Sequence, residues 1–231
     1  WMLLSNIQVD QARIAAKPED RQKLLAASEE SAKKALAAAP GHLDALVRLS
    51  GLAGVRKDAK AQEDYLRQAV DANPTRDRGY TELIRLLFAA GRGEEAAQLV
   101  ATAKTKCPPV RQILRSPLPD REARRDFLAL AARVLIAQKD YEQAATYSNQ
   151  LRLVAPRDVE PLILDGMIAS IRKQPAEAYA LYEQALKQCQ EFLDAPTRAG
   201  SSEMRRQVRL QALRVHVLMS ELQIGQGQTG L

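Results

Sequence analysis

The side chains best suited to acid–base, metal or thiol chemistry are few and lie far apart. The 231-residue sequence contains two histidines, His42 and His216, and two cysteines, Cys107 and Cys189. Neither histidine belongs to a cluster of His, Cys, Asp or Glu with metal-ligand spacing. The cysteines match neither a CxxC motif nor a disulfide framework. We therefore expect buried cysteines, one turn histidine and one helical histidine, and no catalytic or metal-binding residue among the four.

The sequence offers no convincing motif that holds phosphates or builds a nucleophile. There is no GxxxxGK[ST] loop, no GxSxG elbow, and no carboxylate pair that stands apart from ordinary charged helix faces. The Gly-Gln-Gly-Gln-Thr-Gly run at residues 225–230 has GxGxxG spacing, but it follows the last predicted helix and is expected to be a frayed tail. The sequence therefore predicts a protein that is not an enzyme, with no cofactor and no small-molecule substrate.

The composition favours helices and a chain without a membrane span. Apolar residues make up 46% of the chain, charged residues 27% and aromatic residues only 4%, and alanine and leucine are abundant. This balance predicts an all-α fold. The most apolar stretch, Phe127 to Ala137, contains Arg133 and is shorter than the roughly 20 residues that a membrane span needs. The net charge of +6 raises the question of an acidic partner.

The first residues, Trp1 to Leu4, include neither an initiator methionine nor a signal-peptide pattern. We expect this chain to be a segment of a longer protein, and its compartment stays undefined. The high use of alanine and arginine suggests a bacterial source.

Prolines divide the chain into units. Pro40, Pro74 and Pro108 lie 34 residues apart, and each follows an alanine-rich run. Proline lacks the N–H that continues a helix and disfavours helical backbone in the residue before it. Each proline therefore indicates the end of a repeated helical unit.

Apolar residues recur in one order within these units. Reading back from Pro108, the unit is Tyr80-x2-Leu83-Ile84-x2-Leu87, a glycine turn, and then Ala96-x3-Val100-x2-Ala103. The same spacing fits residues 43–74, 77–108, 125–156 and 159–190. Small residues stand where two helices must cross closely, because larger side chains would hold the helix axes apart. They are Ala96, Ala103, Ala144, Gly166, Ala178 and Ala185.

This pattern resembles the tetratricopeptide repeat family, whose 34-residue helix-turn-helix unit follows W-x2-L-G-x2-Y, then A-x3-F, then P. The resemblance covers about residues 43–190 and implies a right-handed α-solenoid of stacked antiparallel helix pairs over residues 1–231. Residues 1–40 would form a degenerate helix pair whose second helix is about two turns too long. Residues 201–224 would form a capping helix with a polar outer side.

Pro108 and Pro156 are 48 residues apart, 14 more than one repeat, and we place this insert around residues 109–124. Its prolines predict that no helix crosses Ser116 to Pro119. Its basic residues could form a second binding surface, or the insert could be a spacer between two half-arrays; both interpretations stay open. The arginines of this second surface are Arg111, Arg115, Arg121, Arg124 and Arg125.

The resemblance implies that the first helix of each pair lines a concave groove that binds a partner. The arginines would bind carboxylates and the apolar residues would contact an extended or helical segment, although an arginine on a helix face is often only solvated. The residues expected to contact the partner are Arg48, Arg78, Arg85, Phe88, Arg133, Ile136 and Met167.

Some family members bind acidic chaperone tails with paired Lys and Asn residues. The matching positions here carry Val47, Gly51, Glu82, Asp126 and Leu130, so this specificity is not expected. The sequence predicts a non-catalytic module or scaffold that binds a protein or peptide segment, including an acidic one, or packs within a larger assembly. The alternative is an RNA-binding helical repeat that uses its basic surface.

Overall fold

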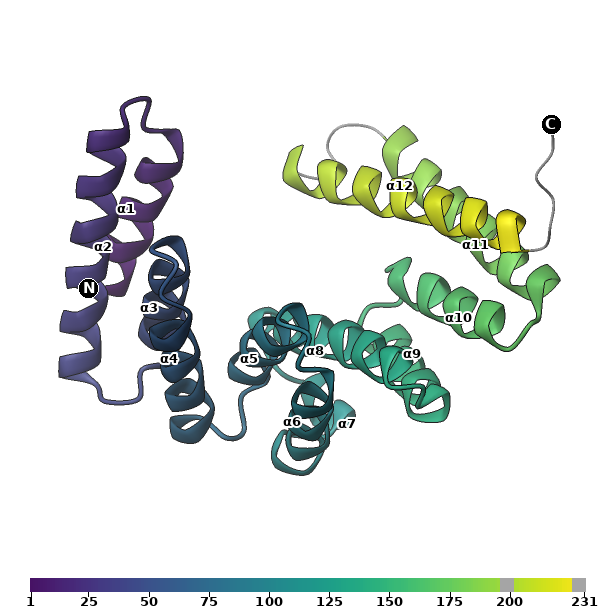
Figure 1. The fold of residues 1–231 in the computed structure, drawn as a ribbon, viewed down its shortest axis with the longest axis horizontal. Helices are drawn as coiled ribbons and strands as arrows, with labels where there is room; N and C mark the ends of the chain where they lie inside the picture. Colours follow the sequence, from purple (N-terminus) through teal and green to yellow (C-terminus); the bar gives the residue numbers. More distant parts are fainter. Residues whose placement is uncertain (196–201, 226–231) are drawn as a thin grey trace. The chain divides into compact units, whose positions relative to one another are not determined.

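The computed structural model describes residues 1–195 and 202–225, which contain twelve helices and no strand (Figure 1). The prediction of an all-α fold is confirmed. The chain divides into two compact units, Trp1–Pro109 and Val110–Leu231. Unit 1 contains α1 (Met2–Ile14), α2 (Pro18–Ala38), α3 (Leu43–Val55), α4 (Ala59–Ala72), α5 (Asp77–Ala89) and α6 (Gly93–Lys106). Unit 2 contains α7 (Val110–Ile113), α8 (Leu118–Ala137), α9 (Tyr141–Val154), α10 (Glu160–Ile171), α11 (Pro175–Asp194) and α12 (Ser202–Gly225).

Unit 1 consists of three helix pairs that pack in chain order. α1 packs on α2, α3 on α4 and α5 on α6, while α2 contacts α3 and α4 contacts α5. The first pair is joined by Ser5 and Ser28, which are both buried and whose hydroxyl oxygens lie 2.8 Å apart. Each hydroxyl also lies within hydrogen-bond distance of the other residue's carbonyl oxygen, so its single proton is donated either there or to the other hydroxyl. Small hydroxyl residues therefore bring α1 and α2 close together with their polar atoms satisfied.

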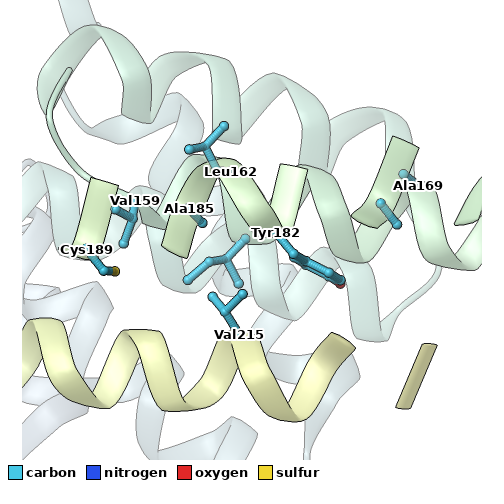
Figure 2. Close-up of a cluster of buried hydrophobic side chains, with 9 residues drawn as sticks. Val159, Leu162, Ala169, Tyr182, Ala185, Cys189 and Val215 are labelled. Atoms are coloured by element: carbon cyan, nitrogen blue, oxygen red, sulfur yellow. The ribbon is translucent and has the colours of Figure 1, made fainter. Parts of the chain in front are cut away.

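Unit 2 repeats this arrangement with α8 on α9 and α10 on α11, and α12 packs mainly on α11. Its core includes Tyr182, Ala185 and Cys189 of α11, which face Leu162 of α10 and Val215 of α12 (Figure 2). Val215 is fully buried. The apolar residues of one face of α12 therefore complete a core that α10 and α11 only partly enclose.

The turns inside four helix pairs share one geometry, in which a residue with positive φ follows the first helix. Three of these residues are lysines, and the φ values are 61° at Lys57, 76° at Gly91, 64° at Lys139 and 59° at Lys173. The next amide N–H donates to a carbonyl oxygen five residues back, as in Asp58 to Ala53 at 3.0 Å. This is the helix-ending Schellman arrangement. A lysine at this position tolerates a backbone conformation that glycine adopts more easily.

The small residues of the repeat lie at close helix crossings, as predicted. Ala96, Ala144 and Ala178 have no exposed surface. Gly166 of α10 lies at another close crossing, where an added Cβ would lie 2.3 Å from Cε1 of Tyr182 in α11. Only a residue without a side chain fits beneath this ring without displacing it.

The insert differs from the expectation for Ser116 to Pro119. α7 forms a single turn, and α8 already begins at Leu118, so Pro119 lies in its first turn. A proline is compatible with this position because the first N–H groups of a helix have no partner within the helix. α8 therefore has 20 residues, whereas α3 and α5 have 13.

The outer face of α12 also differs from the expectation of a polar cap. Four large apolar side chains along the helix are each more than half exposed, because α12 buries its opposite face on α10 and α11. They are Leu210, Leu213, Val217 and Ile224. Residue 201, the expected start of the cap, lies outside the described residues.

Candidate functional site

The groove of unit 1 is a cavity of about 450 Å³ between α1, α2, α3 and α5. Its apolar lining includes Val9, Val47, Leu52 and Val55. Volumes of this size are typical of ligand sites, in which an apolar wall is combined with a few polar groups. The charged residues of the lining are Arg13, Arg21, Asp44, Arg48 and Arg78.

Helical spacing places Asp44 and Arg48 on one face of α3, because residues four apart lie on the same side of a helix. Arg78, at the start of α5, donates a hydrogen bond to Asp44 and forms an ion pair with it. This contact joins the first helices of two successive pairs. Two of the predicted groove residues, Arg48 and Arg78, therefore line the same cavity.

Arg48 differs from Arg78 because its partner is neutral. Its Nη2 donates to the amide Oδ1 of Asn6 in α1 at 2.5 Å, and no carboxylate among the described residues forms an ion pair with it. Burial lowers the pKa of the Arg48 guanidinium, and the nearby positive charges of Arg13 and Arg78 lower it further, whereas Asp10 and Asp44 partly offset them. A carboxylate placed beside Arg48 would relieve this repulsion.

The cavity has a net positive lining. Arg13 lies 3.6 Å from Asp10 in an exposed pair, and Arg21 has no ion-pair partner among the described residues. Four arginines therefore face a single lining aspartate, Asp44. The repeat pattern did not indicate Arg13 and Arg21, because it begins only at residue 43. The one signal that could have indicated them is the unusual length predicted for the second helix of the first pair.

The two remaining groove residues expected in α5, Arg85 and Phe88, lie outside this cavity. Arg85 is exposed and pairs with Glu82 of its own helix at 2.7 Å. Phe88 is half-buried. Neither residue lines the cavity of unit 1, so the structure does not bring all four expected contacts of this unit together.

In unit 2, Arg133 contacts an acidic residue of the chain itself. Its guanidinium donates to Oε1 of Glu160 at 2.6 and 2.9 Å. Ile136 is only 7% exposed. Ile136 is therefore part of the core, which corrects its assignment as an exposed contact, and Arg133 has a partner within the chain.

Met167, the third expected contact in unit 2, lies beside α12. Its sulfur is 3.4 Å from Nη2 of Arg214, and it lines a separate cavity of about 530 Å³ with residues of α10, α11 and α12, including Tyr182 and Leu222. Met167 therefore remains accessible, but in an apolar pocket bordered by the last helix.

The insert does not present its five arginines together. Arg124 is only 5% exposed and lies over the ring of Phe127, with 5.6 Å between its Cζ and the ring centre. Arg125 donates to Asp158 at 2.5 Å. Both are held in place by packing and charge, which corrects their assignment to an open surface. Arg111 and Arg115 are exposed, and Arg121 is half-buried.

The four residues first considered for chemistry occupy structural positions. Cys107 and Cys189 are buried, and burial raises the pKa of the Cys189 thiol. His42 is the residue before α3, and His216 lies within α12. In residues 1–195 and 202–225, no three His, Cys, Asp or Glu side chains group closely enough to hold a metal ion. None of the described helices is long and apolar enough to cross a membrane.

Sequence comparisons give no relative: no family model matches the chain, and no curated protein does. Solved structures do resemble it. Pseudomonas aeruginosa pilF is 14% identical, with a TM-score of 0.57 over 96% of this chain and 91% of that one. A thermophilic TPR protein in Thermus thermophilus is 15% identical, with a TM-score of 0.54 over 92% and 99% of the two chains.

A further structure, YrrB, is described as a TPR protein with an unusual peptide-binding site. It is 15% identical, with a TM-score of 0.50 over 80% of this chain and 91% of that one. At these identities the likeness concerns the fold alone. Together with the repeated helix pairs and their 34-residue spacing, it establishes that this chain has a tetratricopeptide-repeat-like fold.

Proposed function

We propose that this protein is a non-catalytic interaction module that binds an acidic segment of a partner polypeptide in the groove of unit 1. The observation that carries this proposal is the half-buried Arg48, whose only hydrogen-bond partner among the described residues is the neutral amide of Asn6. The guanidinium retains donors that could bind a carboxylate in a bidentate manner.

The charge of the groove favours the same kind of ligand. Arg13, Arg21 and Arg78 raise the positive potential around Arg48, while Asp44 in the lining and Asp10 beside Arg13 oppose it. A carboxylate entering a partly desolvated site of this kind gains more than it would at an open surface, because water screens the interaction less. Arg48 is therefore expected to be the main contact, and the other arginines to increase the association rate.

The apolar wall of the groove favours a polypeptide ligand over a free anion. Val47, Leu52 and Val55 lie beside the arginines. A ligand gains binding free energy from such a surface only when its own apolar atoms cover it. A short segment that carries a carboxylate and an apolar side chain satisfies both parts of the groove. The peptide-binding site named for YrrB supports this class of ligand for the fold.

The test begins with selection of a random 12-residue peptide library on the whole chain. We expect the selected peptides to be enriched in Asp and Glu together with large apolar residues. Dissociation constants of the best synthetic peptides are then measured by fluorescence anisotropy with the wild type and with Arg48→Gln. Loss of charge-assisted hydrogen bonds should weaken binding about 10- to 100-fold.

Arg157→Gln is the matched control, because Arg157 is exposed and lies outside the groove. Its dissociation constants should equal those of the wild type. Selection of peptides without acidic residues, or equal binding by Arg48→Gln and the wild type, would contradict the proposal.

A further inference from the structure

Unit 1 contains a second cavity beside the groove, at the turn between α1 and α2. Its volume is about 480 Å³. The two cavities share Arg21 and Leu25 of α2 and Leu52 and Val55 of α3. A ligand that fills one cavity therefore lies next to the other.

The cavity lies where the second helix of the first pair is longer than the second helices of the other two pairs of unit 1. α2 has 21 residues, whereas α4 and α6 have 14. Figure 1 shows the turn between α1 and α2 lying beyond the end of α3. The beginning of α2 therefore has no neighbouring helix of equal length to cover it, and its inner side remains open above the last turn of α3.

Most of the lining of this cavity is apolar, and it contains small side chains. Ala15, Ala16 and Ala26 contribute little volume, and Val55 is 58% exposed although it lies beside the buried Leu52. Exposed apolar surface next to a recess of this size is typical of a binding site. The space is sufficient for a large apolar side chain.

The charges around the cavity indicate which kind of segment would bring that side chain. Arg56 and Glu29 form an ion pair at 2.5 Å and neutralise each other. Arg21 then remains as the net charge of this lining, and it belongs to the lining of the groove as well. Charge complementarity therefore favours an acidic segment on both sides of the shared residues.

We propose that this cavity binds a large apolar side chain, such as Leu or Phe, of the same acidic segment whose carboxylate contacts Arg48. The inference rests on the proposed function and adds a specificity-determining subsite to it. The segment would place its carboxylate in the groove and its apolar anchor between the start of α2 and the end of α3. Binding would then require both groups at a suitable separation.

The experiment uses a series of labelled peptides with one Asp-Asp pair in a Gly-Ser background. One peptide has no apolar residue, and the others carry a single Phe two to eight residues before or after the pair. Anisotropy with the whole chain should show at least one separation at which Phe improves affinity about 10- to 100-fold, as expected for burying a large apolar side chain.

Ala26→Leu should remove this gain because the larger side chain fills the cavity. Ala26 is an exposed helical residue, so leucine is compatible with α2. Ala37→Leu, at an exposed position near the other end of α2, is the control and should keep the full gain. The peptide without Phe should bind both variants and the wild type equally.

The outcomes separate this inference from the proposed function. A Phe gain that is absent at every separation, or that survives in Ala26→Leu, would overturn the subsite and leave acidic binding intact. Failure of every peptide, with or without Phe, to bind the wild type would overturn the proposed function and the subsite with it.

Discussion

Glu160 of α10 accepts two hydrogen bonds from Arg133 of α8, at 2.6 and 2.9 Å, although its side chain is only 4% exposed. Arg214 of α12 donates to the same carboxylate at 3.1 and 3.3 Å. One buried acid thus connects three helices of unit 2. An arginine that would suit a ligand in an open groove instead helps to fix the spacing of these helices.

Replacing Glu160 with Gln should destabilise the protein, because two arginines lose their shared negative partner in a buried site. Both guanidinium groups keep some contact with solvent, so we expect a loss of about 1–3 kcal/mol in the free energy of unfolding. Urea denaturation measures it. The control Glu203→Gln removes an exposed carboxylate 3.7 Å from Arg206 and should change stability by less than about 0.5 kcal/mol. Equal midpoints for the two variants would argue against a structural role for Glu160.

Replacing Gly166 with Ala tests the close crossing of α10 and α11. The new Cβ would overlap the ring of Tyr182, so the helices or the ring must move, at a cost of about 1–3 kcal/mol. Gly51→Ala is the matched change in α3, where an added Cβ meets no atom within 4 Å. It should stabilise the helix by about 0.5–1 kcal/mol. We expect the melting temperature to fall for Gly166→Ala and to rise for Gly51→Ala. A shift of both melting temperatures in the same direction would contradict this packing.

The free energy of unfolding should fall in acid, partly because protonation of the carboxyls weakens the ion pairs between α4 and α6. Arg92 donates to Glu63 and to Glu95 at 2.6 Å, and these bonds hold the pKa of both carboxyls below the usual 4.5. A lowered folded-state pKa contributes stability above the unfolded value, and this contribution is lost as the pH falls below about 4.5. Arg92→Met should therefore lose less stability than the wild type between pH 5.5 and 3.5.

This pH effect is measured as the shift of the urea midpoint between the two pH values. Arg157→Met removes an exposed arginine elsewhere and should lose as much stability in acid as the wild type. If Arg92→Met matched the wild type, the acid sensitivity would have to arise from other carboxylates.

Nucleic-acid binding should be weak and only slightly dependent on salt. Two of the five insert arginines, Arg124 and Arg125, are held by packing or by Asp158. Few side chains of this surface therefore remain for phosphates. We expect the logarithm of RNA affinity to fall with the logarithm of salt concentration with a slope shallower than about −2, corresponding to fewer than about three phosphate contacts. A slope near −5 would instead favour the RNA-binding alternative.

The sequence was sufficient to predict the helix pairs. Helix ends depend on local features, and Pro40, Pro74 and Pro108 mark them directly because proline cannot continue the backbone hydrogen bonds. The close crossings were also predictable, since a small residue that recurs at the same position of each repeat indicates that a larger side chain does not fit there. Ala144 and Gly166 lie at such crossings.

The contacts of the charged residues could not be predicted in the same way. Arg48, Arg85 and Arg133 all belong to the first helices of their pairs, yet they contact Asn6, Glu82 and Glu160 respectively. Arg85 pairs locally with a residue of its own helix, whereas Arg48 and Arg133 reach partners far away in sequence, and helix packing decides which of these distant partners lies within reach.

The candidate site itself depends on tertiary structure for a related reason. The sequence determined that an alanine-rich chain with regular prolines folds into stacked helix pairs, because backbone hydrogen bonding and apolar periodicity act over short distances. The extra length of the second helix was also predicted, but only the folded chain decided that the turn before α2 lies beyond the end of α3 and that Arg48 contacts the neutral Asn6. Both facts depend on where helices from different repeats come together, and that position is set by packing across the whole unit rather than by any local pattern.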